Sequence, residues 1–113
     1  MKAKELRKLI ANTFSDMNMF YGVNVGDYVE GYKVNYQMPN CVLSENERTY
    51  RIEFDVYSTD SIKVEDICDV IEERLNYASK KVTSWATFIL DARYEKNEKN
   101  EFRKTLVYEV RTY

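Results

Sequence analysis

The chain has 113 residues, 44% of them hydrophobic and 32% charged, with a formal net charge of -2. This length suits one domain over residues 1–113, and the balanced charge excludes a general binder of polyanions. No apolar run approaches the roughly 18 residues that cross a bilayer, and the chain, which has no histidine, cannot build a histidine-based catalytic triad.

The first periodic segment is residues 3–17. Apolar residues recur there every three or four positions, which predicts an amphipathic helix. They are Leu6, Leu9, Ile10, Phe14 and Met17. The opposite face is basic, but Glu5 dilutes it and no tryptophan marks an interface, so a solvated face is favoured over a nucleic-acid or membrane surface. The N-terminus lacks an apolar core and a cleavage site, so we expect no signal peptide.

Residues 18–27 contain two glycines and several turn-forming residues, and we expect them to be irregular. The alternation that follows predicts a strand over residues 28–36, which ends near Pro39 because proline cannot donate to a ladder. One side of this strand carries Tyr28, Tyr32 and Tyr36. Residues 41–43 then begin the next strand, and residues 44–47 form either a turn or a polar stretch within a long hairpin.

Residues 49–76 carry the clearest pattern in the chain. Apolar and charged residues alternate over residues 50–57, which predicts a strand with one apolar face. After a turn at residues 58–61, apolar residues recur at helical spacing, namely Val64, Ile67, Cys68, Ile71 and Leu75. The strand and the helix should fold back on each other and bury both faces. Cys68 then reads as a small buried hydrophobe in a reducing compartment.

Two further strands are predicted near the C-terminus, over residues 84–94 and 102–112, joined by the charged loop 95–101. So short a link indicates an antiparallel hairpin. The predicted fold class is therefore α+β: a two-layer sandwich with a mainly antiparallel sheet and two helices packed on one face, in the order helix, three strands, helix, two strands.

Little in the sequence indicates chemistry. The three glycines are isolated, so no phosphate-binding loop is present. The acids of the second helix, such as Glu65, Asp66 and Asp69, lie on its expected outer face, where solvation explains them better than a magnesium site. Cys41 and Cys68 are too few for a structural zinc site. We expect no enzymatic activity, no cofactor and no metal.

The ten tyrosines are the main unexplained feature. Tyrosine is enriched at protein interfaces, because it joins an apolar ring to a polar tip. Tyr28, Tyr32 and Tyr36 are therefore either an interface or the core side of their strand against the first helix. A base-stacking surface would need a basic groove, and this strand carries only Lys33. Residues 45–76 are also acidic and residues 77–113 basic, which either favours head-to-tail contact between copies or reflects a solvated helix and a charged hairpin.

The layout resembles the tail terminator (tail completion, head–tail joining) proteins of long-tailed bacteriophages and prophages. The resemblance covers nearly the whole chain, and its most telling segments are GYKVNYQMP at residues 31–39 and YRIEFDVYSTDSIKVEDICDVIEERLN at residues 50–76. It implies a structural virion protein that forms a ring, expected to be a homohexamer, on the head-proximal end of the tail tube. Such a ring stops tube polymerisation and presents the surface to which the filled head docks.

The resemblance further implies that the partners are other copies of the chain, the tail tube protein and the head–tail connector proteins, with no membrane and no nucleic acid except DNA that passes through the ring. The protein would reside in the host cytoplasm during assembly and then in the neck region of the virion tail. As candidate interface residues we name Tyr28, Tyr32, Tyr36, Glu45, Glu47, Lys96 and Lys99. The alternatives are a head–tail connector or neck protein of similar fold and, from another class, a small nucleic-acid-binding α+β domain.

Overall fold

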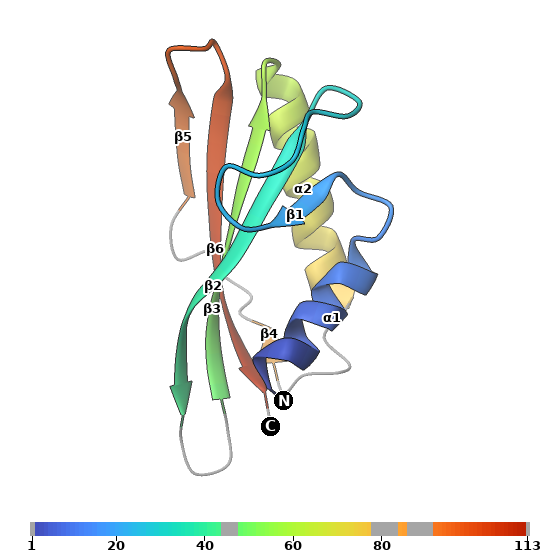
Figure 1. Cartoon of the computed structure of the whole chain (residues 1–113), viewed down its shortest axis with the longest axis vertical. Coiled ribbons are helices and arrows are strands. Elements are labelled where there is room, and N and C mark those ends of the chain that lie inside the picture. Colours follow the sequence, from blue (N-terminus) through green and yellow to red (C-terminus); the bar gives the residue numbers. More distant parts are fainter. Residues whose placement is uncertain (1, 44–47, 78–83, 86–91, 113) are drawn as a thin grey trace.

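The computed structural model describes the chain except residues 1, 44–47, 78–83, 86–91 and 113 (Figure 1). The elements in chain order are α1 (Ala3–Thr13), β1 (Met19–Tyr21), β2 (Lys33–Leu43), β3 (Arg48–Ser58), α2 (Ser61–Tyr77), β4 (Ser84–Trp85), β5 (Ala92–Lys96) and β6 (Phe102–Thr112). Neither helix among the described residues is long and apolar enough to cross a membrane.

The strands form one sheet in the order β1-β2-β3-β6-β4, with β5 also paired to β6. Every pairing is antiparallel except that of β1 with β2. The centre of the sheet is β3, which pairs with β6 from Arg48 opposite Thr112 to Ser58 opposite Phe102. The α+β class and the mainly antiparallel sheet that the sequence predicted are therefore confirmed.

Both helices pack on the same face of this sheet. The even-numbered residues from Tyr50 to Val56 of β3 point into the core, as the alternation predicted. The helix residues of this core are Leu6 and Ile10 of α1, with Phe14 just after it, and Val64, Ile67, Cys68, Ile71 and Leu75 of α2. Phe54 lies at the centre and is fully buried. Its ring centroid lies 5.9 Å from that of Phe14, 6.0 Å from that of Tyr36 and 5.9 Å from that of Tyr108.

The first helix is shorter than predicted, because it ends at Thr13 and not at residue 17. Phe14 leaves the helical conformation (φ -115°, ψ 28°), and the hydroxyl of Thr13 donates to the carbonyl of Leu9 at 2.7 Å. Met17 nevertheless packs against the core. Its helical spacing therefore reflects a core contact that a turn, not a helix, provides.

The strand predicted over residues 28–36 was wrong at both ends. It begins at Lys33, and it continues past Pro39 to Leu43, so residues 41–43 belong to the same strand and do not begin another. Gln37 pairs with Glu53 but Asn40 pairs with Arg51, so three steps along β2 oppose two along β3. Proline is tolerated in this strand because it falls at this bulge, where the ladder is already interrupted.

Two other predictions need correction. Residues 18–27 are not wholly irregular, because Met19–Tyr21 form β1, parallel to Val34–Tyr36. The strand predicted over residues 84–94 corresponds to β4 and β5, which both pair antiparallel with β6, while residues 86–91 lie outside the described part. If the pairing of β4 with β6 continued without a shift, Ala92 would lie opposite Arg103. It lies opposite Leu106 instead, so β4 and β5 pair with β6 in different registers.

Candidate functional site

The most distinctive surface is built by the loop of residues 22–31, which connects β1 to β2. Three side chains fix its backbone: Asn18 donates to the carbonyl of Asp27 at 2.8 Å, Asn35 donates to that of Val25 at 2.7 Å, and Ser58 donates to that of Gly31 at 2.6 Å. Three side-chain-to-backbone hydrogen bonds along one loop indicate that its backbone has a defined conformation.

Glycine is required at one point of this loop. Gly26 has a φ of 82°, in the left-handed region, and a Cβ there would lie 2.2 Å from the ring of Phe20. Both the conformation and the space therefore exclude a side chain. The close approach of Gly26 to Phe20 holds the loop against β1.

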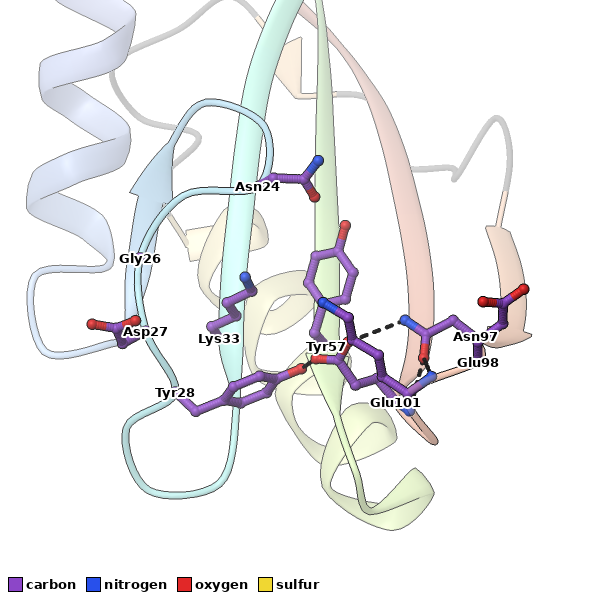
Figure 2. Close-up of a pocket in the computed structure, with 10 residues that line it drawn as sticks. Asn24, Gly26, Asp27, Tyr28, Lys33, Tyr57, Asn97, Glu98 and Glu101 are labelled. Carbon is purple, nitrogen blue, oxygen red and sulfur yellow. Dashed lines mark hydrogen bonds between the residues drawn. The ribbon is translucent and has the colours of Figure 1, made fainter.

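A cleft of about 850 Å³ lies between this loop and the 97–101 turn that joins β5 to β6 (Figure 2). Its floor is formed by Lys33 and Tyr57, which are paired neighbours on β2 and β3. They point away from the helices, because their sequence neighbours Val34 and Val56 point into the core. The cleft therefore opens on the sheet face that the helices leave uncovered.

Polar contacts cross the cleft from wall to wall. The hydroxyl of Tyr28, on the loop, donates to a carboxylate oxygen of Glu101, beside the turn (Figure 2). The Nζ atom of Lys33 lies 5.7 Å from the ring centroid of Tyr28 and 5.3 Å from that of Tyr57, which is within cation–π range. Tyr28 thus links the loop to both the floor and the opposite wall.

The turn forming the second wall is stabilised by its own side chain. The carboxamide oxygen of Asn97 accepts the backbone N–H groups of Lys99 and Glu101, each at 3.0 Å. Such a side-chain-to-backbone arrangement replaces missing ladder bonds and fixes a tight turn. Both walls of the cleft are therefore ordered by hydrogen bonds within the chain.

Exposed apolar side chains gather on the same loop. The large hydrophobic residues that stay exposed in the described chain are Tyr21, Val23, Val25, Tyr28, Val29 and Ile62. Five of these six lie within residues 21–29, and Val23 and Val29 are more than half exposed, at 58% and 53%. Exposed apolar residues that gather in one segment make this loop a candidate surface for binding another molecule.

Ile62 is a further exposed apolar side chain, on another element. It is 70% exposed and opens α2, next to the turn where Ser58 holds Gly31. The loop near residue 30, the start of α2 and the β5–β6 turn all lie at the top of Figure 1. We call the described residues 28–32, 58–62 and 97–101 the loop end.

The candidate interface tyrosines do not behave alike. Tyr32 and Tyr36 are each 6% exposed and belong to the core. Of the two roles that the sequence allowed, an interface or a core position, these two side chains therefore occupy core positions within the chain. The Tyr32 hydroxyl accepts the backbone N–H of Asn18 at 3.0 Å. Tyr28 lies in the loop and not in a strand, and it is 39% exposed.

The charged candidates also separate. Lys99 lines the cleft, whereas Lys96 places its Nζ atom 5.3 Å from the ring of Phe102 on the neighbouring strand. Glu45 and Glu47 lie outside the described residues. Whether any of these residues contacts another protein stays a prediction.

Sequence reasoning missed the valines of the loop and the floor of the cleft. The sequence did contain a signal for Val23, Val25 and Val29. They are apolar residues among glycines and turn-forming residues, and they follow no helical or strand periodicity that would predict their burial. Lys33 and Tyr57 gave none, because only the β2–β3 register brings them together.

The strongest pKa shifts lie in the core and not in the cleft. Burial raises the pKa of the Cys68 thiol to about 12 and holds the pKa of the Tyr108 hydroxyl well above its ordinary value. Cys68 is therefore protonated at neutral pH and is no nucleophile there. Among the described residues, no three histidine, cysteine, aspartate or glutamate side chains group closely enough to hold a metal ion.

Comparison with known proteins gives a likeness in structure. No protein-family model matches the chain, and no curated protein matches it. A solved structure titled as the virion of a native gene transfer agent (GTA) particle contains a chain that superposes with a TM-score of 0.63. The two chains share a fold. The superposition covers 96% of this chain and 89% of that one, at 13% sequence identity.

Proposed function

We propose that this protein is a structural component of a phage-like particle that caps the head-proximal end of the tail tube as an oligomeric ring. In this role it ends tail polymerisation and offers the surface to which the head docks. The observation that carries the proposal is the likeness to a chain of a virion particle over nearly the full length of both chains. The sequence resemblance to tail terminator proteins supports the same role from independent features.

The exposed surface of the chain fits a role in assembly. The valines of loop 22–31 and Ile62 present apolar area next to a polar cleft, as protein interfaces combine an apolar centre with a polar rim. The described chain is also elongated, with extents of 46 × 25 × 22 Å. We propose that the loop end contacts the last ring of the tail tube.

The test uses the tail tube protein encoded by the same genome. Tubes are polymerised with and without this protein, and their lengths and ends are examined by negative-stain electron microscopy. We expect shorter tubes with a distinct ring at one end. Tubes of unchanged length, with the protein free in solution, would contradict the proposal.

A double variant tests the contact surface. Val29→Asp with Ile62→Asp places charge on two exposed apolar side chains, so the fold should be retained while capping is lost. The matched control is Ala11→Asp with Asn12→Asp, which adds the same two negative charges at exposed positions of α1, away from the loop end. Equal capping by both double variants would remove the loop end from the contact.

The same fold likeness is compatible with a head–tail connector, which also forms part of a virion. The two roles differ in the binding partner. A connector binds to the portal end of isolated heads and leaves the growth of tail tubes unchanged. Parallel pull-downs on purified heads and purified tubes therefore separate the two functions.

A further inference from the structure

The turn that leads loop 22–31 into β2 holds one residue in a conformation that its side chain disfavours. Glu30 and Gly31 have φ values of 56° and 86°, so both central residues of the turn are left-handed. Tight turns of this kind prefer the pair Asn-Gly. Among the described residues, the other non-glycine residues with positive φ are Asn24 and Asn100. Asparagine tolerates this region, whereas glutamate rarely adopts it.

The fold imposes this conformation on Glu30. Val29 and Tyr32 exchange two backbone hydrogen bonds across the turn, with N···O distances of 3.2 and 3.4 Å. The hydroxyl of Ser58 donates to the carbonyl of Gly31 at 2.6 Å. The side chain of Glu30 is exposed and forms no hydrogen bond or ion pair with a described residue. A strained residue whose side chain does not stabilise the fold indicates a role toward another molecule.

A small hollow lies beside this turn. Its volume is about 250 Å³, and it is lined by residues 15–18, which follow α1, and by Val29, Glu30 and Tyr32. Sites for small molecules usually measure roughly 300–1,000 Å³, so this hollow is suited to a single side chain. Val29 is 53% exposed and supplies an apolar wall.

One charge in the lining is not compensated within the described chain. The carboxylates of the lining are those of Asp16 and Glu30, and Asp16 is already paired with Arg74. The ring of Tyr32 attracts a cation, because the Nζ atom of Lys63 lies 5.4 Å from its centroid. No described ion pair joins Lys63 to Glu30. The hollow therefore favours a cation, and the carboxylate of Glu30 is available to pair with it.

We propose that this hollow receives a basic side chain, arginine or lysine, of the tail tube protein, with Glu30 as its counter-charge. The stem of such a long side chain packs on the exposed Val29, and the pair is thereby shielded from water, which strengthens it. The fixed turn places the carboxylate before binding, which lowers the ordering cost. The inference rests on the proposed function, because it specifies one contact of the loop end with the tube.

Two substitutions of Glu30 separate its charge from its strain. Glu30→Gln keeps the side-chain length and the strained turn, so its midpoint of urea denaturation should match that of wild type. Glu30→Asn introduces the residue that this turn prefers, so its midpoint should be higher. Both variants lack the charge, and we expect both to bind purified tail tubes at least about fivefold more weakly than wild type at low salt, measured by cosedimentation. A residue with only a structural role would not give higher stability together with weaker binding.

Glu72→Gln is the matched control. Glu72 is exposed on α2, about three turns from the first residue of that helix, and its variant should bind like wild type. Added salt should weaken the binding of wild type more than that of Glu30→Gln, because salt screens the ion pair. Equal binding by Glu30→Gln and wild type, or a Glu30→Asn variant that is no more stable than wild type, would overturn the inference.

The outcome is separable from the proposed function. If wild type caps tail tubes and Glu30→Gln caps them equally well, the counter-charge is wrong while the capping role stands. If wild type binds tubes without shortening them, and Glu30→Gln binds them more weakly, the contact stands and the capping role is wrong. A wild-type protein that does not bind tubes contradicts both.

Discussion

The hydroxyl of Tyr28 and the carboxylate of Glu101 meet across the cleft, although 73 residues separate them in the chain. This hydrogen bond joins the loop that carries most of the exposed apolar residues to the turn between β5 and β6. Its donor ring also lies beside the ammonium group of Lys33. The loop is thereby held in one position before any partner binds, which lowers the ordering cost of binding.

Removing this hydroxyl should loosen the loop. We expect Tyr28→Phe to raise the hydrogen-exchange rates of amides in residues 23–30 about fivefold, since an exposed hydrogen bond contributes roughly 1 kcal/mol. The matched control is Tyr21→Phe, because no described residue forms a hydrogen bond with the Tyr21 hydroxyl. Equal exchange in both variants would show that the Tyr28–Glu101 bond does not restrain the loop.

A comparison of two glycines in the same loop distinguishes the two costs of adding a side chain, steric clash and backbone strain. Gly26 and Gly31 have similar φ values of 82° and 86°, but a Cβ on Gly31 meets nothing within 4 Å, whereas one on Gly26 meets Phe20. Gly31→Ala should cost about 1 kcal/mol of unfolding free energy from the left-handed backbone alone.

Gly26→Ala should cost more than Gly31→Ala, by about 1–3 kcal/mol, because the ring of Phe20 must move. Urea denaturation of the two variants measures the difference. Equal losses of stability would show that Phe20 yields freely and that the loop is not held against β1.

The sequence predicted the centre of the fold well, because the two clearest apolar periodicities, one of a strand and one of a helix, pick out residues that are buried in the core. The alternation of Tyr50 to Val56 and the helical spacing of Val64 to Leu75 each match one core face. β1 was missed because three residues are too few for a period to show. The α1 boundary was wrong because Met17 keeps the helical spacing after the helix has ended.

The candidate site was predictable only in part. The alternation placed Tyr28, Tyr32 and Tyr36 on one side of a predicted strand. It does not reveal where the strand begins, and the position of this first residue decides which of the tyrosines is buried. The cleft depends on the β2–β3 and β5–β6 registers, which set Lys33 beside Tyr57 and bring the 97–101 turn opposite the loop. A pairing register between distant segments is a tertiary property that local sequence does not encode.

The aromatic cluster around Phe54 should dominate stability. Phe54 is fully buried and contacts the rings of Phe14, Tyr36 and Tyr108, which come from the residue after α1 and from two strands. We expect Phe54→Ala to lower the free energy of unfolding by about 3–5 kcal/mol, through lost burial and the cavity left behind. Chemical denaturation measures this, and Val29→Ala at an exposed position should change stability by less than about 0.5 kcal/mol. A similar effect of both variants would contradict the assigned core.

Arg74 ties the end of α1 to α2. Its guanidinium donates to both carboxylate oxygens of Asp16 and to the carbonyl of Thr13, the last residue of α1. The hydrogen bond from Arg74 holds the pKa of the Asp16 carboxyl below its ordinary value of 3.8. A lowered folded-state pKa means that the pair stabilises the fold above pH 3.8 and loses its effect as the pH falls through the lowered pKa.

Asp16→Asn should therefore reduce the melting temperature at pH 7, and its effect should vanish as the pH falls through the lowered pKa and the wild-type carboxyl becomes protonated. Thermal melts of both proteins between pH 2 and pH 7 provide the measurement. The exposed Asp66 offers a matched control, because Asp66→Asn removes a carboxylate without a described ion-pair partner. A constant difference between Asp16→Asn and wild type at every pH would contradict the role of the charge.

The buried thiol of Cys68 should be unreactive in the folded protein. Burial raises its pKa to about 12, so at pH 8 only about one thiol in 10,000 is ionised, and only the thiolate reacts. In a Cys41→Ser background, where Cys68 is the sole thiol, we expect no reaction with a disulfide reagent at pH 8 until denaturant is added, and then one equivalent. Rapid reaction in the native state would show that α2 opens from the sheet, because the residues around Cys68 in the core are the ones that exclude the reagent.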